Sequence, residues 1–252
     1  MIYNPNFIYI HMTKTGGSSM DLFLQNQIEG SIRPVHIGDY LKPEIKERVA
    51  QSRHEPAYRL KVNKELLIGY IRNPYDWYVS FWYWAKAHNP PAYEHFFKHS
   101  IFSDKKLDEF INGIHLTEDQ ISYNTGGLPM ESMKDDFTDI DMKLATELDI
   151  GLLTYKYFYM FHDPAVFKDI ENHKDYLLLD RVLRFENLID DLFTWYNENL
   201  GELEEEKKKM FPCEKKTSHD HYSLYYGDSL RNFIRHKDRI IFDTYDYQFE
   251  RE

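Results

Sequence analysis

The chain has 252 residues, of which 42% are hydrophobic, and a formal net charge of −11 at pH 7. This length supports one large domain with a sizeable core. The acidic balance disfavours sequence-independent binding to nucleic acids or to polyanionic polymers such as heavily sulfated glycans. Cys213 is the only cysteine, so an intramolecular disulfide and a cysteine-rich metal site are excluded.

No repeat, linker or low-complexity segment divides the sequence, and we expect a single domain over residues 1–252. The first residues carry no signal-peptide pattern, and no apolar run reaches the length of a membrane span. We therefore expect a cytoplasmic protein with no membrane span, no nucleic-acid partner and no metal site. The oligomeric state stays open.

The first predicted strand covers Phe7 to Ile10, a short apolar run of strand-forming residues. A polar loop with two glycines follows, and then Met20, Phe23 and Leu24 have helical spacing. A strand, a glycine-rich loop and a helix in this order favour anion binding, because the N-terminus of a helix attracts negative charge. Ser18 or Ser19 is expected to cap the helix. An ordinary strand-to-helix turn is the alternative.

The order of residues in this loop excludes two common nucleotide motifs. In the ATP-binding motif GxxxxGK[ST], the lysine follows the last glycine. Here Lys14 precedes Gly16 and Gly17, and the dinucleotide motif GxGxxG is absent as well. The loop therefore predicts a phosphate or sulfate site without indicating ATP or a dinucleotide.

A second strand-to-helix unit begins with Leu66 to Ile71, an almost continuously apolar run that is typical of a central parallel strand. The next residue, Arg72, stands at a strand end as Lys14 does. An arginine there can hold a phosphate through two parallel hydrogen bonds. An ion pair with a neighbouring carboxylate such as Asp76 is the alternative.

The helix after Arg72 is expected to run from Tyr75 to about Ala87, with Asn73 as its cap. Ser80 lies within its first two turns. His36 follows a short predicted strand, and ligands of α/β sheets gather at strand ends. Further elements are expected at these places: a helix over 41–50, a helix or strand over 151–161, a strand within 176–185, a helix over 186–200, and helices from 225 to 245.

Four segments together carry a resemblance to a known family: IHMTKTGGSS, YIRNPYDWYVSFWYW, VLRFENL and YYGDSLRNFIRHKDRIIFDTYDYQF. They resemble the sulfotransferases that use 3′-phosphoadenosine 5′-phosphosulfate (PAPS), in particular the carbohydrate sulfotransferase branch. The match spans nearly the whole chain, and its first two motifs are jointly specific. The resemblance implies an α/β fold, namely a three-layer sandwich with a mostly parallel central sheet, like that of P-loop nucleotide kinases.

The resemblance also implies roles for residues. The loop that would hold the 5′-phosphosulfate comprises Lys14, Thr15, Gly16, Gly17, Ser18 and Ser19. Arg72 and Ser80 would hold the 3′-phosphate, and Thr217 and His219 fall where the family covers the nucleotide. Three places depart from the family pattern. Ser18 replaces the usual threonine and keeps the hydroxyl, the frequent Asn-x-Ser has become Lys215-Lys216-Thr217, and Trp77 stands where many members have arginine.

The implied reaction moves a sulfuryl group in line from PAPS to an acceptor hydroxyl, leaving adenosine 3′,5′-bisphosphate (PAP), and requires no metal. Lys14 would neutralise the leaving phosphate oxygen. His36 is the first choice for the base that takes the acceptor proton, and His54 is the second. A purely structural role for His36 stays open. The acceptor is expected to be a carbohydrate or glycoconjugate, namely a small or neutral glycan.

Two other functions compete with this one. The first is an ATP-dependent, kinase-like phosphoryl transferase, which the missing GxxxxGK[ST] pattern disfavours. The second is a non-catalytic nucleotide-binding protein that keeps the fold. The presence of Lys14, Arg72 and Ser80 together disfavours that second alternative.

Overall fold

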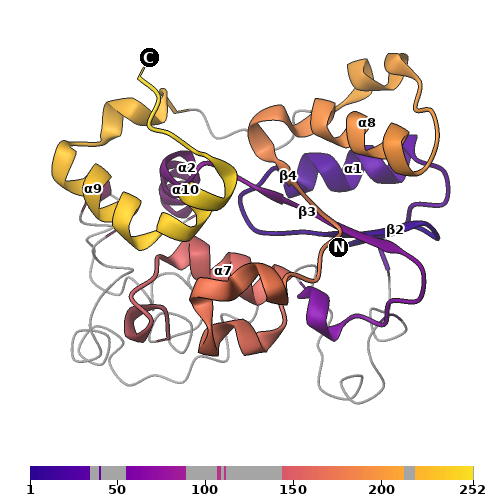
Figure 1. Ribbon diagram of the computed structural model, residues 1–252. Coiled ribbons are helices and arrows are strands. Elements are labelled where there is room, and N and C mark those ends of the chain that lie inside the picture. The colour runs from indigo at the N-terminus through magenta and orange to yellow at the C-terminus, as the bar shows by residue number, and fades with distance from the viewer. Residues whose placement is uncertain are drawn as a thin grey trace. The chain divides into compact units, whose positions relative to one another are not determined.

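The computed structural model describes residues 1–34, 40, 55–88, 107–108, 111, 144–212 and 219–251 (Figure 1). By its contacts the chain forms two compact units. Unit 1 comprises Met1–Arg72 and Tyr157–Lys216, and unit 2 comprises Asn73–Lys156 and Thr217–Glu252. Of the strand expected over 31–36, residues 31–34 are described and form only an isolated bridge between Ile32 and Tyr3. The helix expected over 41–50 lies outside the described residues.

Unit 1 contains a sheet of four strands in the order β1 (Ile2–Tyr3), β2 (Phe7–Ile10), β3 (Leu66–Ile71) and β4 (Arg181–Arg184). β1 is antiparallel to β2, whereas β2, β3 and β4 are mutually parallel (Figure 1). The predicted α/β character with a mostly parallel sheet is therefore confirmed. The three-layer, nucleotide-kinase-like arrangement stays a prediction.

One face of this sheet forms a core with α1 (Gly17–Gln27) and α8 (Leu188–Asn199), which lie on the same side of the strands in Figure 1. Successive strand residues point to opposite faces, so every second side chain joins this core. Burial of these apolar side chains is the main force that holds the two helices on the sheet. The strand contributors are Phe7, Tyr9, Ile68, Tyr70 and Leu183, and the helices add Met20, Phe23, Leu24, Leu192, Phe193 and Trp195.

The opposite face is packed around Gly69. A Cβ atom at this position would lie 2.6 Å from the ring of Phe161 and 2.9 Å from Leu179, so only glycine fits. Phe161 ends α7 (Leu152–Phe161), which confirms a helix rather than a strand in this segment. The expected strand within 176–185 is shorter than predicted, because Tyr176 still belongs to a 3₁₀ helix.

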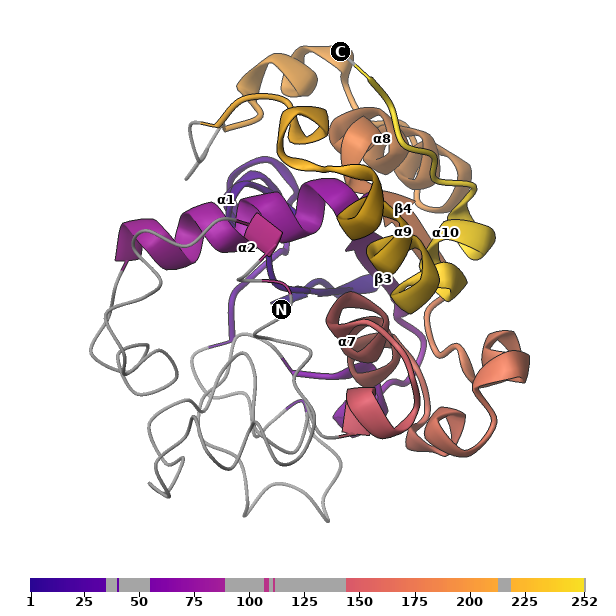
Figure 2. The same cartoon turned by 90° about the vertical axis from the view of Figure 1, so that its left-hand side faces the viewer.

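Unit 2 contains α2 (Pro74–His88), α9 (Asp228–Lys237) and α10 (Arg239–Tyr245), which lie next to one another (Figure 2). The side-chain oxygen of Asn73 accepts a hydrogen bond from the backbone N–H of Tyr75 at 3.1 Å, which confirms the predicted cap. Short 3₁₀ helices complete the two units: η3 (Ala57–Arg59), η4 (Pro164–Lys168), η5 (Ile170–Tyr176), η6 (Phe185–Asn187), η7 (Glu205–Met210) and η8 (Tyr222–Tyr225).

The start of α7 is held in unit 2 by the buried carboxylate of Asp238. This carboxylate accepts hydrogen bonds from the Thr154 backbone N–H at 2.9 Å, from the Thr154 hydroxyl at 2.8 Å and from the Tyr78 hydroxyl at 2.9 Å. Asp238 therefore satisfies backbone donors at a helix start that is distant in sequence. Within the described part of the chain, no helix is both long and apolar enough to cross a membrane.

Candidate anion-binding site

The candidate site lies at the carboxyl edge of the unit 1 sheet. Because β2, β3 and β4 are parallel and in register, Ile10, Ile71 and Arg184 end at the same edge. The segments that leave these strands therefore begin close together, as they do at ligand sites of other α/β sheets. They are the loop after β2, Arg72 after β3, and η6 after β4.

The loop after β2, residues 13–19, is called the anion loop here. Lys14 and Gly16 both have left-handed backbone conformations, with φ values of 63° and 75°. The buried Thr15 hydroxyl donates to the Met12 carbonyl at 2.8 Å and closes the turn. This backbone path leads directly into α1, whose first N–H groups have no acceptor within the helix. The loop thus presents the positive end of a helix at the sheet edge.

The predicted serine cap of α1 is wrong. The helix begins at Gly17, and its N-cap is Gly16, which has no side chain to offer. Ser18 and Ser19 lie inside the first turn instead. Their hydroxyls therefore flank the helix start rather than precede it.

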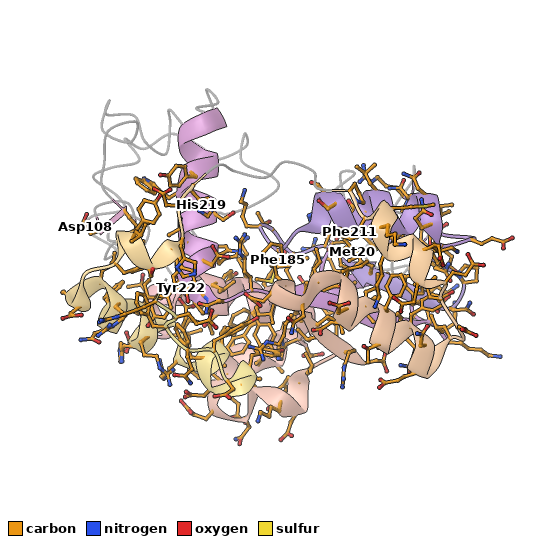
Figure 3. The ribbon with its side chains drawn as sticks, turned by 90° about the horizontal axis from the view of Figure 1, so that it is seen from above. Met20, Asp108, Phe185, Phe211, His219 and Tyr222 are labelled. Atoms are coloured by element: carbon orange, nitrogen blue, oxygen red, sulfur yellow. The ribbon has the colours of Figure 1, made fainter. Side chains whose placement is uncertain are left out.

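Both glycines of the loop are required by close contacts. A Cβ atom at Gly16 would lie 2.8 Å from the ring of Phe185, in addition to the strain of its positive φ. A Cβ atom at Gly17 would lie 2.0 Å from Nε2 of His11. The loop is therefore held tightly between η6 and the end of β2 (Phe185 is labelled in Figure 3).

Arg72 joins the loop from the end of β3. Its guanidinium donates from Nη1 to the Lys14 carbonyl at 3.1 Å and lies 4.2 Å over the ring of Phe185. The Arg72 side chain is 8% exposed. The structure therefore brings together Lys14 and Arg72, which the sequence predicted as parts of one site.

A cluster of charged and titratable side chains that the sequence analysis missed lies beneath the loop. Nδ1 of His11 is 3.1 Å from Oδ2 of Asp21, and Nη2 of Arg33 donates to the same oxygen at 2.6 Å. His11 and Asp21 are 4% and 0% exposed. Burial would raise the pKa of Asp21, but the hydrogen bond and charge of His11, with the charges of the Met1 amino group and Arg33, hold it well below its usual range.

The other predicted site residues have different positions. Ser80 is buried in α2, within unit 2. His219 also belongs to unit 2, where its ring centroid is 5.2 Å from that of Tyr83 (His219 is labelled in Figure 3). His36, His54 and Thr217 lie outside the described residues. Their predicted roles, and those of Ser80 and His219, stay predictions.

Unit 2 contains a cavity of about 550 Å³ with aromatic walls. The Tyr225 hydroxyl on its wall is 2.8 Å from that of Tyr83. This hydrogen bond, together with burial, raises the pKa of Tyr83 to about 12. The cavity size suits a small organic molecule. The lining residues are Trp82, Leu107, Asp108, Leu224, Tyr225, Gly227, Ser229, Leu230 and Phe233.

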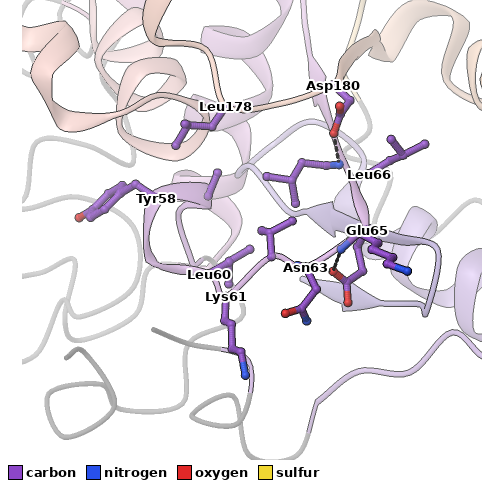
Figure 4. A pocket seen from close by; sticks show the side chains of 12 residues that line it. Tyr58, Leu60, Lys61, Asn63, Glu65, Leu66, Leu178 and Asp180 are labelled. Carbon is purple, nitrogen blue, oxygen red and sulfur yellow. Dashed lines mark hydrogen bonds between the residues drawn. The ribbon is translucent and has the colours of Figure 1, made fainter. Parts of the chain in front are cut away.

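A groove of about 570 Å³ lies in unit 1 near the start of β3 (Figure 4). Its two carboxylates are occupied by backbone donors. Glu65 accepts from the N–H groups of Asn63 and Lys64, at 2.8 and 3.0 Å, and Asp180 accepts from that of Leu67 at 2.7 Å. These contacts fix the turn before β3, and the groove lies at the amino end of the strand, whereas the anion loop lies at the carboxyl edge.

Comparison of the chain with protein-family models, with curated proteins and with solved structures finds no significant match. Among the described residues, no group of three or more histidine, cysteine, aspartate or glutamate side chains is arranged to hold a metal ion. The site is therefore interpreted from its own geometry.

Proposed function

We propose that this chain is a sulfotransferase that moves a sulfuryl group from PAPS to the hydroxyl of an acceptor. The observation that carries the proposal is the contact between Arg72 and the backbone of Lys14 at the carboxyl edge of the sheet. This contact brings two cationic residues, Lys14 and Arg72, together at the N-terminus of α1, where two glycines lie. Such a helix start binds anions through N–H groups and the helix dipole.

The residues of the anion loop fit the phosphosulfate end of PAPS. Gly16 and Gly17 carry no side chains, and the space beside them is taken by Phe185 and His11. Backbone N–H groups at such a helix start can bind an anion. Lys14, Thr15, Ser18 and Ser19 add one charge and three hydroxyls. Arg72, buried beside the loop, suits a second anionic group, which in PAPS is the 3′-phosphate. Ser80, Thr217 and His219 are proposed to assist in holding the nucleotide.

The proposed transfer requires that donor and acceptor be positioned in line and that the charge developing on the phosphate oxygen be neutralised. The bond from sulfur to the phosphate oxygen breaks while a bond from sulfur to the acceptor oxygen forms. Lys14 neutralises the charge that develops on the phosphate oxygen, and a base takes the proton of the acceptor hydroxyl. His36 is proposed as this base, with His54 as the second choice. The acceptor is proposed to be a small or neutral glycan or glycoconjugate.

Calorimetry with PAP and with ATP plus magnesium tests the proposal against the kinase-like alternative. We expect PAP to bind at least about tenfold more tightly, because Arg72 would meet a 3′-phosphate that ATP lacks. Tight binding of ATP without binding of PAP would overturn the sulfotransferase proposal.

Variants then separate binding from transfer. Lys14→Ala should lower the transfer rate by about 100-fold or more, as expected when a group that stabilises developing charge is removed. Arg72→Ala should weaken PAP binding by about tenfold. Lys64→Ala, at the exposed turn before β3, is the matched control and should leave both unchanged. PAP binding without transfer to any hydroxyl compound in a screen with labelled PAPS would favour a non-catalytic nucleotide-binding protein.

The base is tested in the same transfer assay. His36→Ala should abolish transfer while PAP binding is retained. If His36→Ala kept the full rate and His54→Ala did not, the second choice would replace the first.

A further inference from the structure

The proposed function leaves one cluster beside the anion loop without a role: the buried His11 and Asp21 and the Arg33 side chain, which is 45% exposed. His11 follows β2 directly, Asp21 is in the second turn of α1, and Arg33 comes after that helix. Their side chains meet at Oδ2 of Asp21. The buried Asp21 carboxylate loses hydration energy on folding, so its position beside a binding loop calls for an explanation.

We infer that His11 is a positioning residue of the anion loop, which supports Gly17 with its ring and strengthens anion binding when the imidazole is protonated. The inference rests on the anion site of the proposed function. It does not depend on sulfuryl transfer.

The steric part of this role follows from the contact with Gly17. Nε2 of His11 occupies the space that a Cβ atom of residue 17 would fill. Gly17 is the first residue of α1, so the imidazole determines how closely the helix start approaches the end of β2. His11 is 4% exposed, which prevents it from reaching an acceptor substrate as a base would have to.

The electrostatic part follows from the charges of the cluster. Protonation of His11 adds one positive charge beside the loop to those of Arg33 and the Met1 amino group, which already act on the Asp21 carboxylate. Deprotonation of His11 removes that added charge. In a buried setting the effective dielectric constant is low, so a bound anion would respond strongly to this difference.

His11 is the member of the cluster that can change its charge near neutral pH. Asp21, on α1, stays ionised because its cationic neighbours lower its pKa. Arg33 contributes the second cation that contacts the Asp21 carboxylate. Titratable groups near the pair include Tyr9 on β2, whose ring centroid is 6.1 Å from that of His11, and the amino group of Met1.

The first experiment uses the wild-type chain and inorganic sulfate, a probe whose own charge is constant from pH 5 to 9. The NMR signal of the His11 ring is titrated with and without saturating sulfate. Because coupling between two sites is reciprocal, sulfate must raise the pKa of His11 if protonation favours sulfate binding. A tenfold difference in affinity corresponds to a shift of about one pH unit. An unchanged His11 titration would overturn the inference.

The second experiment measures sulfate affinity against pH in three variants. His11→Gln should bind sulfate weakly at every pH, with no midpoint between about pH 5 and 8. Asp21→Asn should move the midpoint downward, because the imidazolium loses its carboxylate. His236→Gln, a half-exposed histidine of unit 2, is the control and should keep the wild-type profile. A wild-type profile in His11→Gln would also overturn the inference.

The outcomes distinguish this inference from the proposed function. If sulfate raises the pKa of His11 but no sulfuryl transfer is found, only the proposed function is overturned. If transfer is found but sulfate leaves the pKa of His11 unchanged, only the inference is overturned. Absence of sulfate, pyrophosphate and PAP binding would overturn both. If a variant fails to fold, the titration of the His11 ring in the wild-type chain, with and without sulfate, still tests the inference.

Discussion

Asp21 in unit 1 and Asp238 in unit 2 are both fully buried, yet their pKa values move in opposite directions. Asp21 shares its carboxylate with His11 and Arg33, and its pKa lies well below the usual range. Asp238 accepts hydrogen bonds from uncharged donors, and burial raises its pKa to about 6 despite them. The charge of the partners, rather than the depth of burial, decides the sign.

The comparison also separates two uses of a buried carboxylate. Asp238 organises a fold, since its partners are the start of α7 and a hydroxyl of α2. Asp21 keeps cations next to the loop that is proposed to bind an anion. Each aspartate cluster is adjacent to a glycine: Gly17 accommodates His11, and Gly151 accommodates Asp238.

The largest expected effect on stability is that of Asp21→Asn. The amide leaves the charge of a protonated, buried His11 uncompensated, and removal of one partner from a buried ion pair lowers the free energy of unfolding by about 3 to 5 kcal/mol. Asp238→Asn should change it by about 1 kcal/mol, because the amide oxygen can still accept from Thr154. Urea denaturation at pH 7 measures both. Equal losses of unfolding free energy in Asp21→Asn and Asp238→Asn would contradict the expected difference between charged and uncharged partners.

The pH dependence of stability should differ in sign between the two aspartates. The pKa of Asp238 is raised to about 6, so its contribution is fully present below the unfolded pKa of about 4. That contribution falls by about 3 kcal/mol as the pH rises through 6. The pKa of Asp21 is lowered, so its contribution is present above about pH 4 and is lost as the pH falls.

Urea denaturation of the wild type and the two asparagine variants from pH 3 to 7 tests these signs. Relative to Asp238→Asn, the wild type should become less stable from pH 4 to 6. Relative to Asp21→Asn, it should become less stable below pH 4. A wild type that gained stability over Asp238→Asn as the pH rose to 6 would show that the sign assigned to Asp238 is wrong.

Substitutions at Gly17 and Gly151 test whether the two aspartate clusters differ in function. Gly17→Ala places a Cβ atom 2.0 Å from His11, and Gly151→Ala places one 2.3 Å from the Asp238 carboxylate. Each should lower the free energy of unfolding by about 1 to 3 kcal/mol through overpacking. Only Gly17→Ala should also weaken sulfate binding, which calorimetry measures on the folded variants. Equal sulfate affinity in both would remove the functional distinction between the clusters.

The smallest effect is expected at Lys14, whose φ of 63° is unfavourable for a residue with a Cβ atom. Lys14→Gly should raise the free energy of unfolding by about 1 kcal/mol while it abolishes sulfuryl transfer. Thermal unfolding measures the change in stability, and the transfer assay measures the loss of sulfuryl transfer. A destabilised Lys14→Gly would show that side-chain contacts of Lys14 outweigh the backbone strain.

The central elements of unit 1 follow closely from local sequence. β2 and β3 have the bounds that their apolar runs predict, because each run is enclosed by polar turn residues. The start of α2 after Asn73 was also predictable from its cap. β1 was not predicted, since two residues carry no periodicity and its pairing with β2 is a tertiary contact.

The candidate site was predicted in part. The sequence indicated Lys14, Arg72 and the two glycines, because loop composition and strand ends are visible locally. It did not indicate the contact of His11 with Asp21, which forms only when α1 packs back on β2. One signal was present: Asp21 lies on the same helical face as Gly17, Met20 and Leu24, and all four are buried. A carboxylate on a buried face predicts a nearby cation.

The path of the chain through unit 1 has a consequence for its synthesis. β3 pairs with β2 on one side and with β4 on the other, but the β4 side is fixed by contacts such as that of Leu67 with Asp180, 113 residues apart. At translation rates of about 5 to 20 residues per second, β3 waits roughly 6 to 20 seconds for this partner. During that time an apolar strand keeps one edge open to other nascent chains. The most regular element of the sheet is therefore the segment that chaperones would have to protect longest.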